Sequence, residues 1–132
     1  MPEPKRLFLT RVVASESAIA EALATAKATK LRAFHVAPDE LFLEGDLSFN
    51  LNDPYAIVTQ DSSLSGLWLG RAEAENFLRH ECPWEWPKLG FAQGMVAHLA
   101  LKLYLETDRV LIICFSPFAQ DLAERLRGYA HE

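Results

Sequence analysis

The chain has few of the residues that build disulfides and metal sites. Its 132 residues include only two cysteines, Cys82 and Cys114, whose spacing matches no disulfide framework or zinc motif. We therefore expect reduced thiols of a cytoplasmic protein, although the sequence alone leaves a pairing of the two open. His80 and Cys82 offer two metal ligands, but no second pair at zinc-like spacing follows, so the sequence predicts no metal site and no cofactor.

Long apolar runs and clusters of positive charge are also missing. The first apolar run, residues 7–14, is too short for the hydrophobic region of a signal peptide or for a membrane span. The basic residues are scattered and the net charge is −5. Binding to nucleic acids or to anionic membranes requires concentrated Lys and Arg. We therefore expect neither nucleic acid nor membrane among the partners.

Apolar residues are plentiful. Half of the chain is hydrophobic and 11% is aromatic, which suffices for one sizeable core but makes a second independent core cramped. The sequence therefore predicts a single domain over residues 1–132.

The first part of the chain, residues 7–45, reads as a strand, a helix and a hairpin. Residues 7–14 are rich in strand formers, and Ser15 or Ser17 can cap the helix that follows. Two short apolar runs, 31–36 and 41–43, then flank a turn that contains Pro38. Residues 46–54 either link two halves or extend the sheet, and their alternating pattern leaves both alternatives open.

A second unit, residues 55–115, repeats this order, and a terminal helix over 117–130 follows it. Its elements are strand-like runs at 55–59 and 64–69, a helix at 71–81 that ends before Pro83, and strands at 99–106 and 110–115. Ser116 and Pro117 have the residue types of an N-cap and a first helical position. The predicted fold class is α+β: two successive β-α-β-β units plus a C-terminal helix, with an antiparallel or mixed sheet and helices packed on one face.

The most unusual segment is residues 83–87, where Trp84 and Trp86 lie between two prolines. We favour the interpretation that both indoles cover the open edge of the core. The alternative is a recognition surface with one exposed tryptophan. If the chain has a pocket for a ligand or partner, Trp84, Trp86, Phe91 and Gln93 are the predicted wall.

Catalytic motifs give no comparable prediction. The chain has no G-x-S-x-G elbow, P-loop or dinucleotide fingerprint. His98, the remaining candidate for a ligand- or partner-binding residue, is expected on the sheet face opposite the leucines of 99–106 if that strand extends back to residue 98. There a solvated or hydrogen-bonded histidine is more common than a general base. We therefore assign no catalytic residue.

Three pieces of the second half carry a family resemblance: Ser-Gly-Leu-Trp-Leu-Gly-Arg-Ala-Glu-Ala at 65–74, Gly-Phe-Ala-Gln-Gly-Met-Val-Ala-His at 90–98, and the run from Asp108 to Ala119. With them, residues 55–129 resemble the folate-binding fold of glycine cleavage T protein and the gamma subunit of sarcosine oxidase. The third piece is most similar to the gamma subunit.

One departure from that family bears on function. The aminomethyltransferases place an acidic residue just after a glycine at the start of this hairpin, whereas residues 94–98 here contain no carboxylate and end in Ala97 and His98. The resemblance therefore implies a non-catalytic accessory or assembly subunit like the gamma subunit, in a homo-oligomer or with a larger protein partner. The alternative is a domain that binds a small molecule, folate-like or aromatic.

Overall fold

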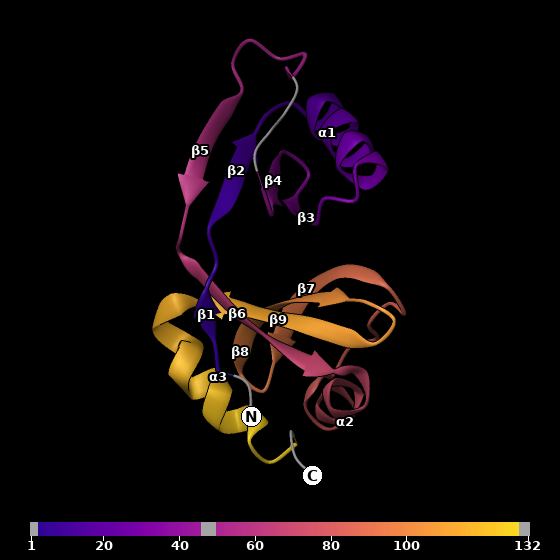
Figure 1. Ribbon diagram of the computed structural model, residues 1–132, viewed down its shortest axis with the longest axis vertical. Coiled ribbons are helices and arrows are strands. Elements are labelled where there is room, and N and C mark those ends of the chain that lie inside the picture. The colour runs from indigo at the N-terminus through magenta and orange to yellow at the C-terminus, as the bar shows by residue number, and fades with distance from the viewer. Residues whose placement is uncertain (1–2, 46–49, 130–132) are drawn as a thin grey trace. The chain divides into compact units, whose positions relative to one another are not determined.

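The computed structural model (Figure 1) describes residues 3–45 and 50–129. The chain forms two compact units. Phe8–Ser62 make up what we call the N-terminal unit; Met1–Leu7 and Ser63–Glu132 make up the C-terminal unit. The N-terminal unit contains β2 (Leu9–Val13), α1 (Glu16–Ala28), β3 (Ala33–Ala37), β4 (Glu40–Leu43) and β5 (Ile57–Asp61). The C-terminal unit contains β1 (Lys5–Arg6), β6 (Leu64–Gly70), α2 (Arg71–Glu81), β7 (Gly90–Val96), β8 (Leu99–Leu105), β9 (Arg109–Phe115), the short 3₁₀ helix η1 (Ser116–Phe118) and α3 (Ala119–Leu126).

The N-terminal unit is one antiparallel sheet of order β3-β4-β2-β5, covered by α1. The helix begins where predicted, because the Ser15 hydroxyl accepts a hydrogen bond from the Ala18 amide at 3.2 Å. Its buried face is narrow and rich in alanine, and it packs on apolar side chains of β2 and β4 (Val12, Leu41 and Leu43). Small side chains on this face suit close packing of the helix on the sheet.

The C-terminal unit is an antiparallel sheet of order β1-β6-β9-β8-β7. Its core lies on the sheet face that α2 and α3 cover. The strict alternation of β8 buries Leu99, Leu101, Leu103 and Leu105, as predicted, against Phe77 and other apolar helix residues. The α+β class with antiparallel sheets, helices on one sheet face and a C-terminal helix is therefore confirmed.

The pairing of β5 differs from the expected order of elements. The strand-like run at 55–59 was expected to open the second unit, 55–115. Instead β5 pairs with β2 over five residues, from Leu9↔Asp61 to Val13↔Ile57, and belongs to the N-terminal unit. A strand's own residues indicate that it is extended but do not specify its partner, so the local pattern placed it wrongly. The prediction of a single domain over 1–132 stays a prediction.

The segment predicted as a linker or strand, 46–54, lies partly outside the described residues, because the description omits 46–49. Residues 50–54 form no strand. They end in a turn at Asp53, whose carboxylate accepts hydrogen bonds from the Ser15 amide at 2.8 Å and the Tyr55 amide at 2.9 Å.

The terminal helix begins differently from the prediction. Pro117 lies in the first turn as expected, but this turn is the 3₁₀ helix η1, and α3 proper starts at Ala119. Ser116 does not cap the helix, because its hydroxyl is hydrogen-bonded to the Ser65 hydroxyl at 2.8 Å. The last residue of the predicted helix, 130, lies outside the described residues.

Candidate functional site

Trp84 covers the outer edge of β7. Its side chain is half-buried, packs against the core of the C-terminal unit, and donates a hydrogen bond from Nε1 to the Met95 carbonyl at 2.9 Å. A Cβ atom built at Gly94 would lie 2.8 Å from the indole, so the ring requires glycine beneath it. Trp86 is also half-buried against the same core. This packing agrees with the favoured interpretation that both indoles cover the core.

Phe91 and Gln93 lie on the opposite face of the same strand. Side chains alternate along β7, and Gly94 points toward Trp84, so the odd-numbered residues point the other way. Across the sheet they pair with Tyr104 and Lys102. The structure thus divides the predicted pocket wall: Trp84 and Trp86 cover one side of β7, and Phe91 and Gln93 occupy the other.

His98 does not lie on a sheet face, because β8 begins at Leu99 and does not extend back to residue 98. With Ala97 it forms the two-residue turn between β7 and β8, and both residues have positive φ angles, 52° for Ala97 and 66° for His98. A tight hairpin turn requires this conformation, although asparagine and glycine usually supply it. Because the turn contains neither residue type, no local motif predicted it.

A small hollow of about 220 Å³ lies beside this turn, lined by Glu81, Pro83, Met95, Ala97 and His98. The Glu81 carboxylate accepts a hydrogen bond from the Tyr129 hydroxyl at 2.6 Å, and this bond raises the pKa of Tyr129. The Glu81 backbone carbonyl accepts another from the Ala97 amide at 3.2 Å. These two hydrogen bonds show that Glu81 holds the turn in place. The hollow itself is smaller than most ligand sites.

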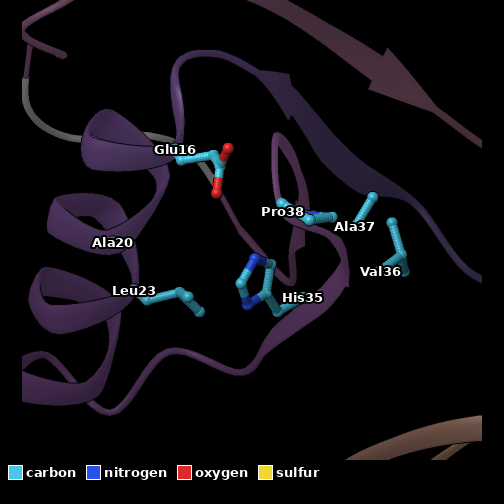
Figure 2. Close-up of a pocket in the computed structure, with 7 residues that line it drawn as sticks. All are labelled: Glu16, Ala20, Leu23, His35, Val36, Ala37 and Pro38. Atoms are coloured by element: carbon cyan, nitrogen blue, oxygen red, sulfur yellow. The ribbon is translucent and has the colours of Figure 1, made fainter.

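A larger hollow lies in the N-terminal unit between α1 and β3 (Figure 2). It measures about 440 Å³ and is lined by Glu16, Ala20, Leu23, His35, Val36, Ala37 and Pro38. Figure 2 shows the Glu16 carboxylate at the start of α1 and the His35 ring between the helix and β3. The other lining side chains are apolar. One carboxylate and one imidazole can bind a polar group, but the other lining residues add no third ionisable side chain.

A third hollow, of about 470 Å³, lies along β1 and β6 of the C-terminal unit. It is lined by Glu3, Lys5, Leu7, Gly66, Leu67, Trp68 and Leu111. The Trp68 ring is half-buried, and the Arg109 guanidinium stacks on it at 3.7 Å from the ring centroid. Trp68 was not among the predicted site residues. The sequence does contain a signal for its position. Trp68 alternates with the inward-facing Leu67 and Leu69, so its side chain must lie on the other face of the sheet.

Both cysteines are free thiols. Burial raises the pKa of Cys114 to about 11. Burial also raises the pKa of Cys82, whose Sγ donates to the Trp84 carbonyl at 3.3 Å. Because the thiolate is the reactive form, neither is activated as a nucleophile at neutral pH.

The outer edge of β5 is exposed. Ile57 and Val58 are 54% and 45% exposed, Thr59 and Gln60 are also exposed, and Tyr55 just before the strand is 88% exposed. Within the described ranges no strand pairs with this edge. This edge was not predicted, because the local pattern of residues 55–59 assigned the strand to the other unit.

Comparison with protein-family models, with curated proteins and with solved structures found no match. Over residues 3–45 and 50–129, no three His, Cys, Asp or Glu side chains are grouped so that they could hold a metal ion. In the same part of the chain, no helix combines the length and apolar character needed to cross a bilayer.

Proposed function

We propose that this protein is a non-catalytic accessory or assembly subunit that associates through the outer edge of β5. The observation that carries the proposal is this five-residue edge strand, regular in its pairing with β2 and exposed at Ile57, Val58, Thr59 and Gln60. An open edge presents unpaired backbone N–H and C=O groups, which another strand can bind.

The roles of the earlier site candidates support this proposal. Trp84 and Trp86 pack on the core, His98 forms a turn, and Glu81 bonds to Tyr129 and to that turn. These residues hold the C-terminal unit together, which accounts for their presence without any chemistry. The departure at residues 94–98 from the aminomethyltransferase pattern agrees with an accessory role.

The test is the mass of the native assembly. The chain, carrying an affinity tag, is produced in its own organism, purified without denaturation, and measured by light scattering after size exclusion. We expect a species well above the 14.8 kDa of one chain. Val58→Lys places a charge on the edge strand and should reduce the mass to that of the monomer. Met95→Lys changes an exposed side chain of the other unit (54%, against 45% for Val58) and should have no effect. A wild-type monomer at every concentration would refute the proposal.

A second candidate function rests on the hollow beside Trp68. The hollow offers an indole, apolar side chains, the Lys5 ammonium and the Glu3 carboxylate, which suits an aromatic ligand that carries both an acidic group and hydrogen-bond donors, as folate-like molecules do. Titration with folate should quench tryptophan fluorescence in the wild type and in Trp86→Phe, but much less in Trp68→Phe. Equal quenching in all three proteins would count against this site.

A further inference from the structure

The described strands end in four sheet edges, and three of them carry a feature that hinders pairing with another chain. The edge strand β1 has only two residues, both basic. The register of β3 shifts between Phe34 and Ala37. The edge of β7 is covered at Met95 by the Trp84 indole. Short strands, bulges, charges and covering groups are the means by which proteins prevent edge pairing.

The fourth edge, β5, has none of these features among its own residues. It is five residues long, regular in register, free of proline and glycine, and uncharged from Ile57 to Gln60. We propose that a second copy of this chain covers it, through an antiparallel β5–β5 pair about a two-fold axis at Thr59. This inference rests on the proposed function and specifies the partner.

The register follows from symmetry. In a two-fold antiparallel pair the residue on the axis faces its own copy, and only an axis at Thr59 pairs all five residues of β5. Thr59 then lies opposite Thr59, Val58 opposite Gln60, and Ile57 opposite Asp61. Threonine pairs are favourable across strands.

The charges of the strand are compatible with self-pairing. Asp61 is the only charged residue of β5, and in this register it faces Ile57 of the other copy instead of a second carboxylate. Within its own chain Asp61 lies close enough to Arg11 to raise the pKa of that guanidinium, in addition to the larger effect of Glu40. Arg11 therefore already offsets part of the negative charge at this end of the strand. Because one pair of short strands buries little surface, we expect a concentration-dependent dimer.

The test is site-specific cross-linking with a short bis-maleimide in a Cys82→Ser background, which leaves only the buried Cys114 as a native thiol. Thr59→Cys places two thiols opposite each other, about 5 Å apart between Cα atoms, and should give a covalent dimer. Ile57→Cys is the matched control, because its two thiols would be separated by four residues along the strand, roughly 13 Å. It should give no dimer alone, whereas Ile57→Cys combined with Asp61→Cys should.

Charge exchange at the axis provides a second measurement that does not depend on thiol geometry. Thr59→Glu and Thr59→Lys should each weaken self-association about fivefold, since like charges then face each other. An equimolar mixture of the two should recover the association. Equal cross-linking at positions 57 and 59, or no recovery in the mixture, would overturn the β5–β5 register. A third outcome is that the purified chain stays monomeric while Val58→Lys still lowers the mass of the native assembly. The partner is then a different protein, so this inference fails and the accessory role stands.

Discussion

The edge strands β7 and β5 differ in what covers them. Along β7 the Trp84 indole lies against Gly94 and donates a hydrogen bond to the Met95 carbonyl, so that part of the edge is covered from within the chain. Along β5 the residues from Ile57 to Gln60 are exposed. Both strands have regular register with their neighbours, so regularity does not distinguish them.

The comparison shows that an unusual residue and a functional residue need not coincide. The tryptophan loop is the most conspicuous feature of the sequence, yet its packing protects a sheet edge. The sequence of β5, Ile-Val-Thr-Gln-Asp, is unremarkable, yet it forms the edge for which residues 3–45 and 50–129 supply no such protection.

The largest expected effect comes from uncovering β7. Trp84→Ala removes half-buried apolar surface and the hydrogen bond to Met95, and should lower the free energy of unfolding by about 2–3 kcal/mol. It should also add a second site of association at β7. Trp84→Phe is the control, which keeps most of the packing and should lose only about 1 kcal/mol. Urea denaturation measures the loss of stability, and light scattering measures the added association. If Trp84→Ala is as stable and as little associated as Trp84→Phe, the covering role is contradicted.

The next effect comes from displacing the indole without removing it. Gly94→Val introduces atoms where a Cβ would already lie 2.8 Å from the ring, and should cost about 2 kcal/mol through overpacking. Gly128→Val is the matched control, because nothing lies within 4 Å of a Cβ there. Comparable losses in the two variants, measured by urea denaturation, would show that Trp84 does not depend on the close approach.

A smaller effect, of opposite sign, is expected at the turn that ends β7. His98→Gly relieves a positive φ angle of 66°, worth about 1–2 kcal/mol, but gives the unfolded chain more freedom. We expect a net gain of about 0.5 kcal/mol in thermal or urea unfolding. Ala100→Gly, at an exposed strand position two residues later, should instead lose about 0.5–1 kcal/mol. A loss of stability in both variants would contradict the assigned turn conformation.

The smallest effect concerns the hydrogen bond between Tyr129 and Glu81. The raised pKa of Tyr129 means that the folded state holds this proton more tightly than the unfolded state. Its contribution to stability is therefore present below the ordinary tyrosine pKa near 10 and is lost as the pH rises through the higher folded value. Tyr129→Phe should flatten the stability profile of the wild type above about pH 10. If the stability of Tyr129→Phe falls as steeply above pH 10 as that of the wild type, the loss comes from other groups.

The sequence predicted those helix ends and strand faces that depend on residues close together in the chain. Ser15 marked the start of α1, Pro83 the end of α2, and the alternating leucines the inward face of β8. Each signal acts within a few residues, through a hydrogen bond, a steric clash or side-chain alternation. The α+β class followed from them.

The errors concern features that depend on distant contacts. β7 contains two glycines and a weak alternation, and it is ordered by pairing with β8 and by Trp84. β5 joins β2, from which α1 and a hairpin separate it in the chain. The His98 turn uses residue types that disfavour its conformation, so tertiary contacts such as the Ala97–Glu81 hydrogen bond maintain it. The division of the predicted pocket wall follows directly from the unrecognised β7.

The most direct test of the central claim compares the two edges within one protein, by hydrogen–deuterium exchange of the backbone amides at low and high protein concentration. If β5 is the site of association, amides of Ile57–Asp61 should exchange more slowly at high concentration, whereas those of Gly90–Val96 should be unchanged. Concentration-independent exchange along β5, or protection that appears along β7 instead, would contradict the account.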